Sequence, residues 1–205
     1  MAQNIKDFYN VAQRKDFARL FQFRVTQLGG SLDFINNDDL IYLDTASLPG
    51  RTINNVPVPY MGLSFNVPGT ASYPGSAAYR VTFRCDAGYD IRSKLEQLSF
   101  RVFNDDTSTG EYTIPGPESV LQMDLYTSGS RTDLAPTIVR RYKLYGVYVV
   151  SLDDVAYDIK DTGSVAMVNA TLAYQYWRAF NTAGRAGDGV DEVVPNTFSG
   201  GVERP

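Results

Sequence analysis

Two pairs of neighbouring carboxylates, Asp38-Asp39 and Asp153-Asp154, come nearest to a catalytic arrangement in this sequence. Carboxylate pairs act as acid and base in glycoside hydrolysis. Side chains adjacent on a strand point to opposite faces, however, and aspartate is common in turns. We therefore interpret both pairs as solvated turns. The sequence contains no histidine, which excludes histidine-based acid–base catalysis, histidine-activated nucleophiles and histidine-ligated metals.

Three further segments resemble ligand-binding motifs without completing them. Residues 105–111, "DDTSTGE", have Thr107 and Thr109 where a calcium loop requires acidic or amide ligands, so this segment is interpreted as a turn. The segment "GTASYPGS" lacks the lysine of a phosphate-binding loop. The triplet Asn169-Ala170-Thr171 matches a glycosylation signal but falls within an expected strand. We expect no enzyme activity, no cofactor and no metal.

The composition bounds the classes of function that remain. The chain has 205 residues with 19 basic and 23 acidic side chains, and its formal charge of −4 argues against tight, phosphate-driven nucleic-acid binding. No apolar run is long enough to span a bilayer, and "MAQNIKDFYN" lacks the layout of a signal peptide. Cys85 is the single cysteine, which favours a reducing compartment. Fourteen tyrosines and eleven phenylalanines favour strands or an extensive interface.

The spacing of apolar residues predicts a mainly β chain with one or two helices. Helical spacing occurs over residues 4–19, and again at Ile91, Leu95, Leu98 and Val102, where Asp90 is the expected N-cap. Alternation predicts strands over the following segments: 20–30, with Phe21, Phe23, Val25 and Gln27 on one face; 39–46; 78–86, with Tyr79, Val81, Phe83 and Cys85 on one face; 120–127; 137–152, bent at Gly146; and a final strand over 164–180. Residues 1–180 are expected to form one domain and residues 181–205 a flexible or partner-ordered tail.

The segment "ASLPGRTINNVPVPYMG", residues 46–62, combines turn-forming residues with apolar ones. Its prolines and glycines exclude a helix or a central strand. Arg51 is the only charged residue between Asp44 and Arg80. Surface loops are normally polar because only water covers them. Parts of this segment could pair with residues 39–46 as a long hairpin.

Four stretches in this order resemble the tail tube protein of contractile-tailed, T-even-like bacteriophages. They are "DFARLFQFRVTQLGGSLDF", "TASLPGRTINNVPVPYMG", "FNVPG…YRVTFRCDAGYDIRSKLEQ" and "YKLYGVYVVSLDDVAYDIKDTGSVAMVNATLAYQYW", and together they cover most of residues 16–178. The sequence departs from the family in a longer loop at 69–78, an insert at 104–118 and the tail after Phe180.

This resemblance implies a structural protein of the virion tail. Such a subunit is a β-sandwich or barrel, and six copies form a ring whose strands join into one shared inner β-barrel. Stacked rings form the hollow tube through which DNA is delivered when the sheath contracts. The implied partners are further copies of the chain, the sheath protein, baseplate-tube and tail-terminator proteins, and DNA passing non-specifically through the lumen. Assembly would take place in the cytoplasm of the host bacterium.

Two groups of residues become candidate assembly sites under this resemblance. The candidate inter-ring loop, which a neighbouring subunit would cover, consists of Leu48, Pro49, Arg51, Ile53, Val56, Val58, Tyr60 and Met61. The alternative is a loop folded back on its own barrel. The candidate lumen or seam residues are Arg140, Arg141, Lys143, Asn169 and Thr171. A DNA conduit should present acidic or neutral polar groups inward, so the basic residues are expected at a subunit seam, paired with Asp153 or Asp154, or solvated outside the tube.

Two other functions remain open at this stage. The nearer one is an inner tube, tube-end or baseplate protein of a related contractile injection system. The other is a monomeric ligand-binding β-sandwich that uses the tyrosines as a binding platform.

Removal of the C-terminal tail is expected to leave the subunit's own fold intact. Residues 181–205 are rich in glycine and carry a net charge of −2, from Arg185 and Arg204 against Asp188, Asp191, Glu192 and Glu203. A chain ending at Phe180 should therefore unfold at nearly the same temperature as the full chain, measured by circular dichroism. A large loss of thermal stability would mean that the tail packs into the core.

Overall fold

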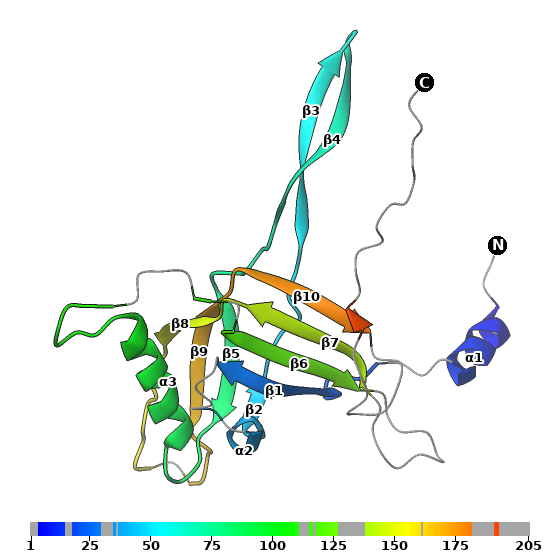
Figure 1. The fold of residues 1–205 in the computed structure, drawn as a ribbon. Helices are drawn as coiled ribbons and strands as arrows, with labels where there is room; N and C mark the ends of the chain where they lie inside the picture. The colour runs from blue at the N-terminus through cyan, green and yellow to red at the C-terminus, as the bar shows by residue number, and fades with distance from the viewer. Residues whose placement is uncertain are drawn as a thin grey trace.

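The computed structural model describes residues 4–14, 18–29, 35, 37–110, 115–116, 118–126, 138–160, 162–181 and 191–192. Two sheets form the body of the molecule, a long hairpin projects from it, and helix α1 lies away from it (Figure 1). The elements are α1 (Ile5–Arg14), β1 (Phe23–Gly29), α2 (Asn37–Leu40), β2 (Leu43–Thr45), β3 (Thr52–Tyr60), β4 (Leu63–Ser72), β5 (Tyr79–Arg84), α3 (Asp90–Val102), β6 (Val120–Tyr126), β7 (Ile138–Tyr145), β8 (Tyr148–Leu152), β9 (Met167–Ala173), β10 (Tyr176–Asn181) and β11 (Asp191–Glu192).

The core lies between a five-stranded and a four-stranded antiparallel sheet. The strand orders are β1-β6-β7-β10-β11 and β2-β5-β9-β8. The inward side chains alternate along each strand, as the sequence predicted for Tyr79, Val81 and Phe83, which are at most 4% exposed. The core residues are Val25, Leu28, Leu121, Met123 and Leu144 from the five-stranded sheet, and Tyr79, Val81, Phe83, Val149, Val168, Ala170 and Leu172 from the four-stranded sheet. The predicted mainly β fold is confirmed, and the sheets stay open within one subunit.

Two chain segments pass from one sheet to the other and join them. In Figure 1, β5 and β9 run steeply across β6 and β7, as in sandwiches whose corners are made by bent strands. Gly146, with φ of 68°, separates β7 from β8, which confirms the predicted bend. The second corner lies between β9 and β10, where the Gln175 N–H donates to the Tyr145 carbonyl at 2.9 Å. The two corners are therefore hydrogen-bonded to each other.

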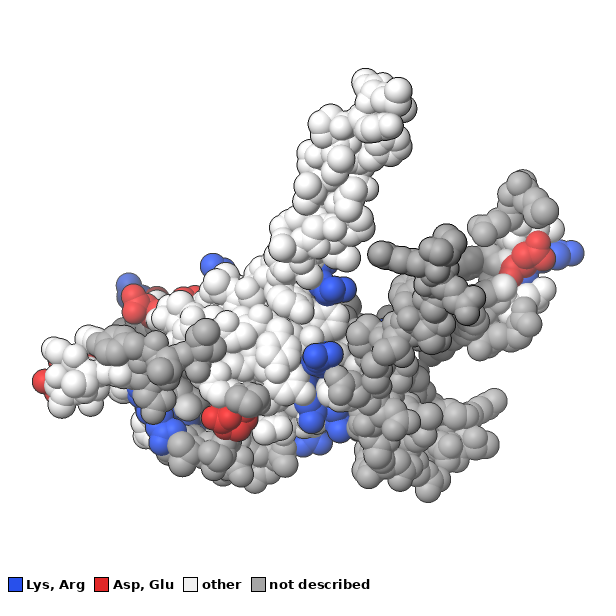
Figure 2. All heavy atoms as spheres, turned by 45° about the horizontal axis from the view of Figure 1, so that its top comes forward, with Lys and Arg blue, Asp and Glu red and all other residues white. Residues whose placement is uncertain are grey.

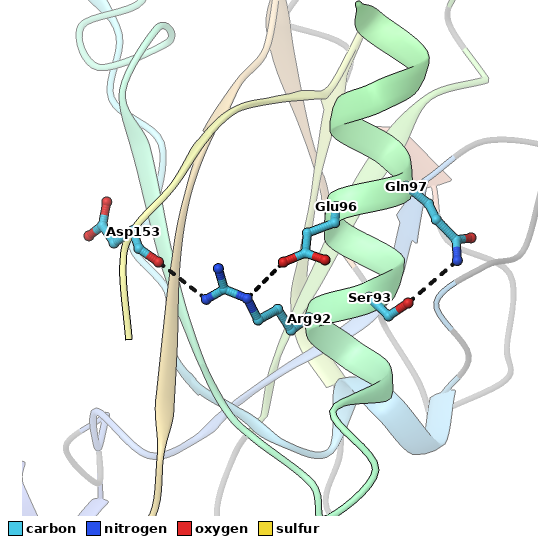
Figure 3. A network of polar contacts seen from close by, with 5 residues as sticks. All are labelled: Arg92, Ser93, Glu96, Gln97 and Asp153. Atoms are coloured by element: carbon cyan, nitrogen blue, oxygen red, sulfur yellow. Dashed lines mark hydrogen bonds and ion pairs between the residues drawn. The ribbon is translucent and has the colours of Figure 1, made fainter. Parts of the chain in front are cut away.

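Helix α3 closes one end of the sandwich. Ile91 and Leu95 of the predicted apolar stripe are buried, and Leu98 packs against the core. Arg92 links the helix to the segment after β8: it donates to Glu96 on the next turn at 2.8 Å and to the Asp153 carbonyl at 3.4 Å (Figure 3). The predicted N-cap is wrong: Tyr89, with φ of 56°, occupies that position without a side-chain cap, and Asp90 lies in the first turn.

Several predicted segments differ from the structure in pairing or extent. The final strand predicted over 164–180 is two strands, because the chain turns the second corner before Tyr176. Residues 39–46 do not pair with the following loop, since β2 pairs with β5. Residues 69–72 extend β4 rather than forming part of a loop.

The first strand also differs in which side chains face the core. A β-bulge between Val25 and Gln27 shifts the alternation, so Leu28 is buried where Gln27 was predicted. Most of the predicted 181–205 tail lies outside the described residues. Of the part that is described, Asp191 and Glu192 pair with Asn181 and Phe180. Part of the 104–118 insert is likewise outside them. No helix within the described segments is long and apolar enough to cross a membrane.

Replacing Gly146 by alanine should destabilise the subunit by about 1–2 kcal/mol, because an L-residue is strained at positive φ. The added Cβ would also lie 2.6 Å from the Gln175 Cγ, at the junction of the two corners. Urea unfolding followed by tryptophan fluorescence measures the change. The matched control is Gly50→Ala, where the nearest atom to a new Cβ is 4.0 Å away and little change is expected. Equal stability of the two variants would contradict this role of Gly146.

Candidate assembly surfaces

The candidate inter-ring loop forms a hairpin that stands out from the body. Strands β3 and β4 pair with each other and not with either sheet, and Figure 1 shows them projecting together. Two hydrogen bonds hold the preceding segment to the core: Tyr79 Oη donates to the Ser47 carbonyl at 2.5 Å, and the Trp177 indole N–H donates to the Gly50 carbonyl at 2.9 Å. Burial raises the pKa of Tyr79 well above its ordinary value, so the phenol remains a donor. The alternative of a loop folded back on its own barrel is wrong.

The hairpin has one apolar face and one polar face. The strand register places Val56 opposite Val67, Val58 opposite Phe65 and Tyr60 opposite Leu63. Residues directly opposite each other in an antiparallel pair share a face. We call these six side chains the apolar hairpin face; each is between 44% and 65% exposed. The other face carries Asn55, Pro57, Pro59, Ser64, Asn66 and Pro68.

No charged residue interrupts this surface. The whole projecting hairpin is white in Figure 2, while basic side chains appear at its root. The sequence from Thr52 to Ser72 contains no Lys, Arg, Asp or Glu. An exposed apolar surface of this kind marks an interaction site in a soluble protein.

Prolines restrict how a partner can approach the hairpin. Proline is tolerated in a strand where its missing N–H would face away from the neighbouring strand. Pro57 and Pro59 therefore leave the open edge of β3 without two hydrogen-bond donors, and Pro68 does the same on β4. A partner strand would pair poorly along these edges. The apolar hairpin face, not an edge, is the surface suited to docking.

The remaining loop candidates lie at the root and the tip of the hairpin. Leu48, Pro49 and Arg51 precede β3, and Ile53 is its second residue. Met61 and Gly62 form the two-residue turn with φ of 49° and 79°, the positive values of a hairpin turn. Sequence reasoning missed the second strand, with Leu63, Phe65 and Val67. The alternation in "LSFNV" after the Met-Gly turn could have revealed it.

The candidate lumen or seam residues divide between the two sheets. Arg141 and Lys143 lie on the outer face of the five-stranded sheet, whereas Asn169 and Thr171 lie on the outer face of the four-stranded sheet. Arg140 alternates away from Arg141, and its guanidinium lies 5.4 Å from the Tyr142 ring centroid. The two groups therefore lie on different sheets and cannot line the same surface of one subunit.

Arg141 has a structural partner within its own sheet. Its Nε and Nη2 donate to the two carboxylate oxygens of Asp124 at 2.6 and 2.8 Å, and Asp124 is only 1% exposed. The hydrogen bond to Asp124 raises the pKa of Arg141 above its ordinary value. Arg24 lies opposite Asp124 on the other side, so the buried carboxylate sits between two arginines in register. Arg141 pairs here with Asp124, not with Asp153 or Asp154.

The outer face of the five-stranded sheet carries an excess of positive charge. Arg24, Arg141, Lys143 and Arg178 share this face with Asp124, and we call them the basic face. Lys143 lies opposite Arg178, and its Nζ is 5.4 Å from the Phe180 ring centroid. The whole chain carries a charge of −4, so positive charge is concentrated on this side.

The outer face of the four-stranded sheet is richer in neutral polar groups. Thr82 Oγ1 lies 2.9 Å from Asn169 Oδ1 and donates to it, and Thr171 lies opposite Arg80. Arg84 on the same face is ion-paired with Asp44. This face therefore offers hydroxyl and amide groups with Arg80 as its remaining basic side chain.

One pocket of about 580 Å³ lies beside the start of α3. Its lining includes three carboxylates, Asp86, Asp154 and Asp158, and the edge-to-face pair Tyr89 and Tyr157. Burial is the main cause that raises the pKa of the Cys85 thiol at its wall, which leaves the thiol less nucleophilic. Among the described residues, no three His, Cys, Asp or Glu side chains are placed to hold a metal ion. The pocket shows no nucleophile paired with a base.

Comparisons with known proteins identify the fold. No protein-family model matches the sequence, and a search of curated proteins finds no match. The structure resembles the tube-terminating cap of the anti-feeding prophage (12% identity, 82% of this chain, 93% of that chain, TM-score 0.56). It also resembles a chain of the PVC extracellular contractile injection system sheath-tube complex (12% identity, 84% and 97% of the two chains, TM-score 0.54).

A type six secretion system protein aligns over 82% of this chain and 90% of that chain at 17% identity, with a lower TM-score of 0.44. The chain therefore has the fold of tube and tube-cap proteins of contractile injection systems.

Replacing Arg141 by methionine should destabilise the subunit by about 3–5 kcal/mol, because Asp124 would be left buried with its bidentate partner removed. Denaturant unfolding measures the loss. The double variant Asp124→Met with Arg141→Met should recover much of it, since an apolar pair removes the uncompensated charge. Arg140→Met is the matched control and should change stability little. A neutral effect of Arg141→Met would show that Arg141 is a dispensable surface charge.

Proposed function

We propose that this protein is a tail tube subunit of a contractile-tailed, T-even-like bacteriophage. Six copies form a ring, and stacked rings form the hollow inner tube that delivers DNA when the sheath contracts. The uncharged apolar hairpin face is the observation that carries this proposal, because a monomeric protein gains nothing from exposing it. The shared fold with tube and tube-cap proteins supports it.

The open sheets support a ring built through strand edges. Strands β1 and β8 lie at the edges of the two sheets. Edge strands present unpaired N–H and C=O groups, and closing them into one barrel between copies removes those edges. The partners of the assembled tube are the sheath protein, baseplate-tube and tail-terminator proteins, and DNA in the lumen.

Of the two outer sheet faces, we assign the four-stranded one to the lumen. Phosphate groups bind basic surfaces and would be held by them during passage. On this face Asn169, Thr171 and Thr82 offer neutral polar groups, Arg84 is ion-paired with Asp44, and Arg80 adds one positive charge. The basic face carries more positive charge and would retain DNA. Under this assignment, Arg141 and Lys143 face away from the bore, where an acidic partner surface suits them.

Two related roles would need much the same subunit: a protein at the end of a tube, and a tube protein of another contractile injection system. Electron microscopy of the assembly distinguishes a tube-end protein, which stops at single rings, from a tube subunit, which forms long polymers. The presence of capsid and terminase genes beside the gene for this chain would separate a phage from an injection system.

Purified protein should form rings or tubes in negative-stain electron micrographs. The variant Val58→Asp with Phe65→Asp should abolish stacking, because it buries two charges in the docking surface. Thermal unfolding of the two-sheet body should change little, since both side chains are about half exposed and the hairpin pairs with neither sheet. The matched control, Asn66→Asp, places a charge on the polar face of the same hairpin and should still assemble. A protein that remains monomeric at high concentration, even when seeded by a baseplate, would contradict the proposed function.

A further inference from the structure

Helix α1 carries a second exposed apolar surface. Ile5, Phe8, Tyr9 and Ala12 recur at spacings of three and four and form one stripe on the helix, while Lys6 and Asn10 lie away from it. Ile5 is 85% exposed and Tyr9 is 61% exposed. Helices of this length are marginal in water and gain their stability by packing an apolar face. Something must therefore cover this stripe when the helix is stable.

The helix and the hairpin leave the body at opposite ends of the five-stranded sheet. Phe23 is the first residue of β1, after the segment that connects α1 to the body. Across the sheet it lies in register with Leu125, Arg140 and Asn181. The hairpin root is fixed at the other end, where Trp177 of β10 donates to the Gly50 carbonyl. In Figure 1, α1 lies beyond the β10 arrowhead, while β3 and β4 rise above β10, back from its arrowhead.

We infer that α1 of one copy packs on the apolar hairpin face of the next copy. The two surfaces match in size: ten helical residues extend about 15 Å, and Val56 to Tyr60 extend about 14 Å along the strand. Both surfaces are also apolar. The hairpin has no charged residue, so docking the apolar helix stripe on it removes no charged hairpin group from water. The prolines at the strand edges favour a partner that lies on the face, as a helix does.

Because α1 and the hairpin leave opposite ends of the five-stranded sheet, the proposed contact joins two different surfaces and is heterologous. A surface at one end of a copy that binds a different surface at the other end of the next copy leaves both free ends available for further copies. Such contacts propagate into open stacks rather than closing as a dimer. The inference thus rests on the proposed tube and names the contact that would join successive copies.

Docking of α1 on its own hairpin would need a nearly fully extended connection. The Phe23 row and the Trp177 row are four residues apart, which is about 14 Å along the sheet, and Val56 lies six residues beyond Gly50, about 20 Å up the hairpin. The eight residues between Arg14 and Phe23 reach at most about 28 Å when fully extended. A neighbouring copy presents its hairpin to α1 without this extension.

Disulfide trapping between two different variants tests the contact. The first variant carries Ala12→Cys, the second carries Val58→Cys, and both carry Cys85→Ala so that no other thiol is present. The variants bear tags of different size, are mixed, are imaged by negative stain and are then oxidised. A disulfide requires Cα atoms within about 7 Å, so only direct docking gives a covalent heterodimer on a non-reducing gel. We expect heterodimer as the main cross-linked species.

The matched control replaces Val58→Cys by Asn66→Cys, on the polar face of the same hairpin, and should give at least tenfold less heterodimer. Equal cross-linking of both hairpin faces would overturn the inference. Tubes in the micrographs without heterodimer would overturn the docking contact and leave the proposed function standing. Heterodimer without tubes or rings would support the contact and contradict the tube, and the absence of both would overturn both. A single chain with Ala12→Cys and Val58→Cys that forms only a monomeric disulfide would show docking within one copy.

Discussion

The constraint on which the rest of the structure depends is the double passage of the chain between the two sheets. Strand β7 continues into β8 through Gly146, and β9 continues into β10 through Gln175, so each passage supplies one strand to each sheet. The corners are hydrogen-bonded to each other at Tyr145 and Gln175. The two passages together join the sheets at a crossing angle, and Trp177, two residues after the second corner, contacts the hairpin root at Gly50. The projecting surfaces are therefore set in direction by the core.

Charge is distributed unevenly over the surfaces that this core displays. The hairpin has none, the four-stranded sheet shows mostly hydroxyl and amide groups, and the five-stranded sheet shows Arg24, Lys143 and Arg178 around a buried Asp124. In the proposed ring, each of these surfaces would repeat with every copy, so a local excess of one charge would become a continuous band. A neutral band suits a channel for a polyanion, and a basic band suits an acidic outer partner. The buried Asp124 offsets part of the repulsion among these basic groups.

The sequence predicts most of the elements because each strand of the body buries one face. Alternation at Tyr79, Val81 and Phe83, the helical stripe on α3 and the bend at Gly146 all follow from local periodicity and glycine geometry. The predicted strands are wrong where a β-bulge or a corner between the sheets interrupts the local alternation. The bulge after Val25 moves the buried position to Leu28, and the corner before Tyr176 divides one alternating run between two sheets.

The candidate site was less accessible to sequence reasoning than the fold. Val56, Val58 and Tyr60 were found because uncharged apolar residues among prolines are unusual, but their partners in β4 were not. Arg141 and Asn169 were grouped because both lie in long alternating strands, and only the sheet order separates them. The pairing of Arg141 with Asp124 joins residues on neighbouring strands, which no local pattern in either strand reveals.

The hairpin must stay soluble before it finds a partner, and its prolines offer a physical explanation of how it does so. An exposed, apolar, uncharged two-stranded ribbon is a template for pairing with other chains along its edges. Pro57 and Pro59 remove donors from one edge and Pro68 from the other, so edge-to-edge growth lacks a continuous ladder. The apolar face remains available, because prolines on the opposite face do not cover it. The same residues that make this segment unsuitable as a central strand thus restrict its association to contacts made face-on by a partner of matching shape.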